Sequence, residues 1–215
     1  MNDVMTALAA VAPLASGWAW HGVTMRRRLA AARRDPLSGL PTRAAFERRA
    51  DRALARGQHV VIVMDLDGFK GLNDAFGHAA GDAAIRVTAM SLTGFLNGRR
   101  GSVAARLGGD EFAAVVPVTD RVALPWLLGG LHGAVTAPFR YSGRDLAVGA
   151  SIGACVTSDL PVASLSLALR RADEAMYEAK RAGGGWRIAE GPALTHTTTA
   201  GRRTGRPGTS RGEAA

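Results

Sequence analysis

The spacing of apolar residues predicts that helices and strands alternate in the central part of the chain. From Thr42, apolar side chains recur at helical spacing as far as Gly57, which predicts a helix with Thr42 as its N-cap and the glycine as its stop. The run His59–Met64 is largely apolar and rich in β-branched residues, as is typical of a buried strand. This strand ends on Asp65, so a carboxylate stands at the edge of the predicted sheet.

The later elements follow from the same kind of pattern. They are a helix over residues 81–96, two strands over 102–107 and 111–118 joined by a tight turn at Gly108-Gly109, a strand over 146–156, and a helix over 165–182. The order helix, strand, helix, hairpin, strand, helix predicts an α+β domain whose helices cover a mainly antiparallel sheet. We expect one globular domain of ordinary size over residues 35–190.

An apolar segment precedes this domain. Residues 4–23 contain no charged side chain except the usually neutral His21, and Arg26 to Arg28 follow directly. As a helix the segment would measure about 30 Å, the thickness of a hydrocarbon core. Because Trp18 and Trp20 stand near the arginine-rich end, the segment is predicted to anchor the protein in the inner membrane, with its globular domain in the cytoplasm. The alternative is an Ala-rich helix that packs on its own domain or on a partner.

The chain is strongly basic, but its excess charge lies outside the predicted domain. The net charge is +9, yet residues 1–34 hold five Arg and one Asp, and residues 191–215 hold four Arg and one Glu. Residues 35–190 therefore carry only +2, and residues 191–215 are predicted to be a disordered basic tail. A nearly neutral domain argues against nucleic acid as a partner. The single cysteine, Cys155, stands in an apolar run and is expected to be a core residue in a reducing compartment.

Three carboxylates are the first candidates for chemistry. Asp65 ends a strand, and Asp110 and Glu111 follow the glycine pair of the predicted hairpin. If these strands are neighbours, the carboxylates converge at one edge of the sheet, where they would suit Mg²⁺ shared with substrate phosphates. The competing interpretation is that acidic residues beside glycine simply occupy a solvated turn.

The stretch between Asp65 and Asp82 adds polar groups that suit a nucleotide. Lys70 can meet phosphate oxygens, Asn73 offers an amide, and the Asp82 carboxylate can accept hydrogen bonds from the neighbouring donors on a guanine edge. Turn and N-cap roles are the alternative for Asn73 and Asp82. Of the 27 basic residues, only Lys70 and Lys180 are lysines, which is consistent with a compact ammonium being needed for phosphates.

At this point the residues match a family: the chain resembles the GGDEF domain of bacterial diguanylate cyclases from Asp35 to about Gly185. The motif of that name stands intact as Gly108-Gly109-Asp110-Glu111-Phe112. The other matching blocks, in the family's order, are DPLSGLPTRAAF (residues 35–46), DLDGFKGLNDAFGHAAGD (65–82), SIGA (151–154) and RADEAMYEAK (171–180). Five ordered blocks are far more specific than a single motif.

The resemblance implies a fold and a reaction. The fold would be a nucleotide-cyclase or palm-like sheet with a ferredoxin-like core. The reaction would condense two GTP into cyclic di-GMP and release two pyrophosphates. Since each domain of the family binds one GTP, the resemblance implies a homodimer that brings two half-sites face to face.

The resemblance also assigns roles to residues of this sequence. Asp65, the Leu66 carbonyl and Glu111 would bind Mg²⁺ or Mn²⁺. Asp110 would be a metal ligand and the base for the attacking 3′-hydroxyl. The substrate-binding residues would be Asn73 and Asp82 for guanine and, for the phosphates, the backbone N–H of Phe69 together with Lys70 and Lys180.

Two positions depart from the family pattern. Gly184 stands where many members carry a basic residue, which suggests weaker phosphate binding. The inhibitory Arg-x-x-Asp motif reads Arg99-Arg100-Gly101-Ser102, so its Asp is missing, and we expect weak or absent product inhibition.

The main alternative function is a catalytically weak or inactive module that binds GTP or cyclic di-GMP as a regulator. A cyclase for adenine-containing dinucleotides is disfavoured by Asp82.

Overall fold

The computed structural model describes residues 18, 20–21, 24 and 33–191. The predicted membrane segment, residues 4–23, and the predicted tail, residues 191–215, therefore lie almost wholly outside the described residues. Within the described part of the chain, no helix combines the length and the apolar character needed to cross a membrane.

The described domain is a mixture of helices and strands in the order α2 (Arg43–Leu54), β1 (His59–Asp67), α3 (Phe69–Phe76), α4 (His78–Leu96), β2 (Val103–Gly108), β3 (Glu111–Pro117), η1 (Arg121–Ala123), α5 (Leu124–Thr136), β4 (Phe139–Tyr141), β5 (Arg144–Leu146), β6 (Gly149–Val156), η2 (Thr157–Asp159), α6 (Leu165–Arg181) and β7 (Gly185–Ile188). The predicted helices and the predicted hairpin are present with ends that differ by a few residues, and only the strand predicted over residues 146–156 is divided.

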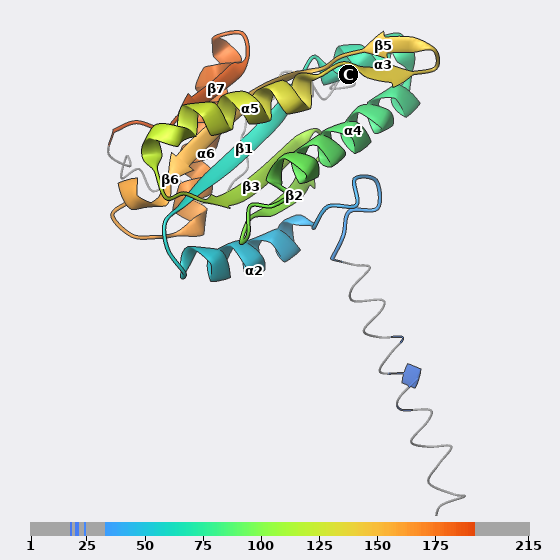
Figure 1. The fold of residues 1–215 in the computed structure, drawn as a ribbon. Helices are drawn as coiled ribbons and strands as arrows, with labels where there is room; N and C mark the ends of the chain where they lie inside the picture. The colour runs from blue at the N-terminus through green and yellow to red at the C-terminus, as the bar shows by residue number, and fades with distance from the viewer. Residues whose placement is uncertain (1–17, 19, 22–23, 25–32, 192–215) are drawn as a thin grey trace, which may run out of the picture.

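A five-stranded sheet of order β2-β3-β1-β6-β7 forms the centre of the domain (Figure 1). All neighbouring pairs are antiparallel except β6 and β7, which run parallel. Strands β4 and β5 form a separate two-stranded sheet. The predicted fold class, an α+β domain with a mainly antiparallel sheet flanked by helices, is confirmed.

Helices cover both faces of the sheet, and the strands alternate accordingly. Val60, Ile62 and Met64 of β1 belong to a buried cluster with residues of α4 and α5, which lie together on one side of the sheet in Figure 1. Val61 and Val63 belong to a second cluster with residues of α2 and α6. We call these two sides the α4/α5 face and the α2/α6 face.

Helix α6 approaches the sheet closely because β6 carries a glycine beneath it. A Cβ atom placed on Gly153 would lie 1.9 Å from the Ala172 carbonyl oxygen and 2.2 Å from the Met176 backbone nitrogen. Ala168, Ala172 and Ala175 form the buried stripe of the helix, so small residues meet on both sides of this contact. The glycine therefore sets the distance between α6 and the sheet.

Several elements escaped the sequence analysis. They are α3, α5, the β4–β5 hairpin and β7. Helix α5 buries Leu124, Leu128, Leu131 and Val135 at helical spacing, but three glycines among its thirteen residues weaken the helix signal. The strand predicted over residues 146–156 is divided, because β5 ends at Leu146 and β6 begins at Gly149.

Two predictions about single residues can be compared with the structure. Thr42 does occupy the N-cap position of α2, but its side chain makes no capping hydrogen bond; its hydroxyl donates instead to the Arg33 carbonyl. Cys155 is buried in the core, as predicted, and burial raises the pKa of its thiol to about 11.

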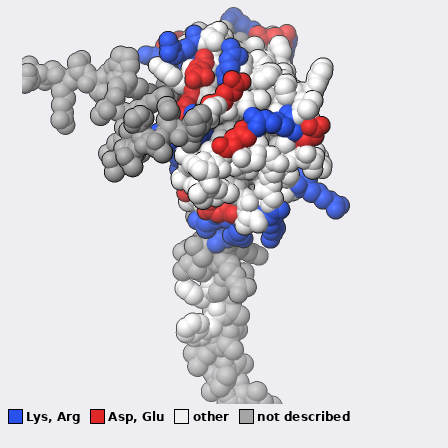
Figure 2. Space-filling model, turned by 90° about the vertical axis from the view of Figure 1, so that its left-hand side faces the viewer, with Lys and Arg blue, Asp and Glu red and all other residues white. Residues whose placement is uncertain are grey.

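On the face shown in Figure 2, Lys and Arg side chains are interspersed with Asp and Glu, in keeping with the nearly balanced charge of the domain.

The contact beneath α6 gives a first prediction. Gly153→Ala should lower the free energy of unfolding by about 3 kcal/mol or more, because the new methyl group meets helix backbone that cannot rotate away. Gly133→Ala is the matched control, since a Cβ on Gly133 of α5 would contact nothing within 4 Å. This control should gain up to about 1 kcal/mol from helix propensity. Urea denaturation of both variants tests the contrast, and equal stabilities would contradict it.

Candidate active site

The pairing of β1 with β3 places two predicted site residues opposite each other. In this antiparallel register Asp65 is the partner of Glu111, and the backbone N–H of Leu66 donates to the Asp110 carbonyl at 3.3 Å. Directly opposed residues of an antiparallel pair project from the same face. The carboxylates of Asp65 and Glu111 therefore share one face of the sheet, next to the glycine turn.

Alternation along the strands decides which face this is. Asp65 follows Val61 and Val63 in the odd positions of β1, so it faces α2 and α6, and Asp67 follows in the same series. Ser151 of β6 is the partner of Asp65 in the other pairing, and its hydroxyl donates to Asp67 at 2.8 Å. A polar cluster thus gathers at the end of three neighbouring strands on the α2/α6 face.

Helix α6 contributes the cation of this cluster. The Lys180 ammonium lies 2.5 Å from the Asp65 carboxylate and 3.8 Å from that of Asp67. Burial alone would lower the pKa of Lys180, but the hydrogen bond to Asp65 and the charges of Asp65, Asp67 and Asp110 outweigh burial and raise the pKa above its usual value. The lysine is therefore a fixed positive charge at the carboxylate end of the sheet.

Whereas its surroundings favour the charged form of Lys180, those of Glu111 disfavour its charged form. Burial raises the pKa of its carboxyl, and the negative charges of Asp65, Asp173 and Asp110 raise it further, while Arg43 lowers it. The negative charge at this edge is thus only partly neutralised by Lys180 and Arg43. A divalent cation would relieve this repulsion, so the donor set fits a hard metal ion.

This metal site would not be made of side chains alone. In the described residues, no group of three or more His, Cys, Asp or Glu side chains is arranged to hold a metal ion by itself. Asp65 and Glu111 with the Leu66 carbonyl would leave several positions to water and to substrate phosphates, as is usual for Mg²⁺. The sequence-predicted ligands fit a metal held jointly with a nucleotide.

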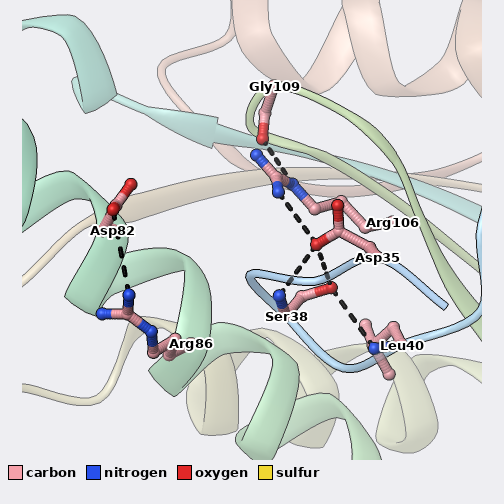
Figure 3. A network of polar contacts seen from close by, with 7 residues as sticks. All are labelled: Asp35, Ser38, Leu40, Asp82, Arg86, Arg106 and Gly109. Atoms are coloured by element: carbon pink, nitrogen blue, oxygen red, sulfur yellow. Dashed lines mark hydrogen bonds and ion pairs between the residues drawn. The ribbon is translucent and has the colours of Figure 1, made fainter. Parts of the chain in front are cut away.

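The two predicted guanine-binding residues lie on neighbouring helices. Asn73 of α3 packs closely against Gly81 of α4. The contact leaves no room for a side chain, since a Cβ on Gly81 would lie 2.1 Å from the Asn73 amide oxygen. Asp82 is the next residue, and its carboxylate lies 3.8 Å from the Arg86 guanidinium one turn along α4 (Figure 3). The structure therefore brings the amide of Asn73 and the backbone that carries Asp82 together.

The predicted phosphate-binding residues are less closely grouped. Phe69 is the first residue of α3, directly after Gly68, whose φ of 73° is in the left-handed region. Lys70 is exposed and makes no hydrogen bond or ion pair within the described part of the chain. Lys180 reaches Asp65, so of the two lysines it is the one that contacts a predicted metal ligand.

Sequence analysis missed two members of the cluster. Asp67 and Ser151 stood inside matching blocks, but neither was singled out. The alternation of β1 carried the signal for Asp67, since it is two residues after Asp65 and must share its face. Gly184 lies against this carboxylate: a Cβ on Gly184 would be 3.2 Å from an Asp67 oxygen, and the φ of Gly184 is 101°.

Comparison with known proteins decides the family. The family model for the diguanylate cyclase GGDEF domain matches residues 32–185. The chain belongs to the GGDEF-domain family of diguanylate cyclases. The predicted family is confirmed, and with it the class of enzyme that the family represents, a nucleotidyltransferase.

The relatives of this GGDEF domain include both short and long proteins. An uncharacterized 19.3 kDa protein of Streptomyces ambofaciens is 49% identical over 165 residues, which cover 76% of this chain and 87% of that protein. Diguanylate cyclase DgcP of Pseudomonas aeruginosa is 39% identical over 155 residues, which cover 69% of this chain but only 22% of DgcP. The solved GGDEF domain of TpbB from Pseudomonas aeruginosa superposes with a TM-score of 0.68 at 38% identity, covering 73% of this chain and 94% of the TpbB domain.

The raised pKa of Glu111 in the GGDEF hairpin gives a second prediction. A carboxyl whose pKa is higher in the folded than in the unfolded state destabilises the fold where it is ionised, and this cost disappears as pH falls through the folded-state pKa. In EDTA at pH 7, Glu111→Gln should therefore raise the melting temperature, and the gain should shrink in acid.

Glu174→Gln is the control for this prediction. Burial would raise the pKa of Glu174, but hydrogen bonds and charges from Arg171 and Arg170 outweigh it and lower the pKa. Glu174→Gln should therefore lower the melting temperature at pH 7, with the loss fading as pH falls. Thermal denaturation followed by circular dichroism, from about pH 4 to about pH 8, measures the melting temperatures of both variants. Shifts of the same sign in the two variants would contradict the assignment.

Proposed function

We propose that this protein is an active diguanylate cyclase that condenses two GTP into cyclic di-GMP and releases two pyrophosphates. The observation that carries the proposal is the register of β1 and β3, which sets Asp65 opposite Glu111 beside the intact glycine turn, with Lys180 against Asp65. The family supports cyclic di-GMP synthesis in general. The roles of the individual residues below are part of the proposal.

The carboxylates would act on the reacting end of the nucleotide. Asp65, the Leu66 carbonyl and Glu111 are proposed to hold Mg²⁺ or Mn²⁺ together with the triphosphate. Bound divalent ions supply positive charge to the nonbonding oxygens of the transferred phosphoryl group and to the leaving pyrophosphate. Asp110, which follows the glycine pair, is proposed to accept the proton of the attacking 3′-hydroxyl and to share in metal binding.

Binding and orientation of GTP would fall to α3, α4 and α6. Asn73 and Asp82 are proposed to bind guanine, which fits the packing of Asn73 against Gly81. Lys180 is proposed to contact phosphate oxygens, and its raised pKa keeps it protonated at any physiological pH. The Phe69 N–H and the exposed Lys70 are proposed to complete the phosphate contacts at the start of α3.

The reaction favours a homodimer. Cyclic di-GMP contains two equivalent phosphodiester bonds, and a two-fold arrangement of half-sites, each with one GTP, would form both with the same residues. We propose this arrangement from the family resemblance. Anchoring of the dimer to a membrane through residues 4–23 stays a prediction of the sequence, because the segment lies almost wholly outside the described residues.

One observation favours the alternative of a weakly active or inactive regulator that binds GTP or cyclic di-GMP. Gly184 provides no side chain where many family members have a basic residue, and its φ of 101° with Asp67 alongside disfavours any other residue there. Phosphate binding would then depend on Lys180 and Lys70. Product analysis distinguishes the two functions, since the regulator would bind nucleotide without turning it over.

The central test of the proposal is Asp110→Ala in the full chain. With GTP and Mg²⁺, the wild type should form cyclic di-GMP, and the variant should lose about 10²–10⁴-fold in rate, the usual contribution of a positioned base. Mass analysis of the products measures this. Asp145→Ala is the control, because Asp145 forms an exposed ion pair with Arg140 in the β4–β5 hairpin. Undiminished product formation by Asp110→Ala would overturn the assignment.

Product inhibition gives a fourth prediction. Arg99 lies over the Phe95 ring at 5.0 Å from its centroid, and the Ser102 hydroxyl, at the position of the missing Asp, has no hydrogen-bond partner in the described structure. We expect added cyclic di-GMP to inhibit initial rates weakly or not at all, and Ser102→Asp to strengthen inhibition. Inhibition of the wild type at low-micromolar product that Arg99→Ala abolishes would show this expectation to be wrong.

A further inference from the structure

An arginine outside the predicted site holds the glycine turn that carries Asp110. Arg106 lies in β2, two residues before Gly108. Its Nε donates to the Gly109 carbonyl at 2.9 Å, and its Nη1 donates to the Asp35 carboxylate at 2.9 Å (Figure 3). One guanidinium therefore joins the turn to Asp35, which lies 71 residues before Arg106 in the chain. We call Asp35, Arg106 and the Gly109 carbonyl the turn clamp.

The far end of the turn clamp is itself fixed. The Asp35 carboxylate also accepts hydrogen bonds from the Ser38 backbone N–H at 2.8 Å and the Ser38 hydroxyl at 2.7 Å. The Asp35 N–H donates to the Leu40 carbonyl, and the Arg106 N–H donates to the Pro41 carbonyl. The carboxylate is thus held in a closed loop of the chain and presents one geometry to the arginine.

The turn needs such a restraint. Gly108 has a φ of 148° and Gly109 a φ of 53°, and the ladder between β2 and β3 is irregular between Arg106 and Gly108. Two glycines have access to far more backbone conformations than other residues. Without the tether at the Gly109 carbonyl, this segment would be restrained only from the Asp110 side, where the Leu66 N–H binds the Asp110 carbonyl, and the direction of the Asp110 side chain would be less closely fixed.

The turn clamp and the sheet hold Asp110 from both sides. Arg106 binds the carbonyl that precedes Asp110, and the Leu66 N–H binds the carbonyl of Asp110 itself. Arg106 is the partner of Phe112, which packs on the α4/α5 face, whereas Asp65 and Glu111 project from the α2/α6 face. The arginine therefore supports the turn from the side opposite the carboxylates, without occupying their site.

We propose that Arg106 and Asp35 are positioning residues that fix the backbone of Asp110 for the reaction. This inference rests on the proposed function for its catalytic meaning, but its structural content is independent of turnover. Within the described residues, their side-chain hydrogen bonds and ion pairs go to Gly109, Ser38 and each other, and none goes to a proposed nucleotide-binding side chain. The geometry requires a fork, since two nitrogens of one side chain bind two acceptors in different directions, which the single nitrogen of lysine cannot reproduce.

The first arm of the test measures the turn itself. Amide hydrogen exchange of residues 107–111 is followed without nucleotide or metal in wild type, Arg106→Gln, Arg106→Lys and Asp35→Ala. We expect exchange in this segment to become about ten times faster in all three variants, while exchange in β1 and α6 stays unchanged. Unchanged exchange at residues 107–111, or a uniform increase across the domain, would overturn the proposal.

The second arm measures turnover. In the variants, kcat should fall about 10- to 100-fold, as for residues that orient catalytic groups, with the half-saturating GTP concentration within about threefold of wild type. Arg106→Lys should resemble Arg106→Gln, and wild-type activity of the lysine variant would overturn the proposal, because charge alone would then suffice. Arg121→Gln is the matched control: it breaks an ion pair with Asp159 at the opposite end of the sheet and should leave kcat unchanged.

The two arms separate the inference from the proposed function. If wild-type protein forms no cyclic di-GMP, the cyclase assignment fails, and the exchange arm alone decides whether the turn clamp holds the turn. If wild-type protein is active and only the exchange changes, with kcat unaffected, the clamp is structural and the positioning role is overturned.

Discussion

The register between β1 and β3 is the constraint on which the whole candidate site depends. Successive side chains of a strand point to opposite faces, so a slip of one residue would turn Glu111 away from Asp65. The register is protected because both faces of β1 are buried: Val60 and Ile62 pack under α4 and α5, and Val61 under α2 and α6. Apolar packing far from the site thereby fixes the geometry of its carboxylates.

A second constraint sets the position of the cation. Lys180 lies at the end of α6, and its distance from Asp65 follows from how deeply the helix sits on the sheet. Gly153 allows the helix backbone to contact β6 directly, and the alanine stripe of α6 fits the same narrow gap. The SIGA and RADEAMYEAK blocks of the sequence are therefore the two sides of one packing contact.

The sequence predicted those parts of the molecule that local pattern encodes. Clear periodicity or turn signals mark three elements: the strand ending on Asp65, the hairpin at Gly108-Gly109 and the final helix. The predicted convergence of the Asp65, Asp110 and Glu111 carboxylates followed from the first two. The contact of Asp35 with Arg106 could not be predicted, because it joins positions 71 residues apart through side chains whose directions depend on the finished fold. Strand β7 was missed for a similar reason, since four residues beginning with glycine form a strand only by pairing with β6.

The charges of the domain distinguish structural carboxylates from functional ones. Burial would raise the pKa of Asp35, but hydrogen bonds from Ser38 and Arg106 outweigh it and lower the pKa. The pKa of Glu174 is lowered in the same way by Arg171 and Arg170. Glu111 shows the reverse, because burial and neighbouring carboxylates dominate. Arginine partners stabilise the charged forms of the partly buried Asp35 and Glu174, whereas repulsion among carboxylates remains at the GGDEF hairpin, so the fold has given up stability there. Binding of a divalent cation with a nucleotide is the physical event that would recover it.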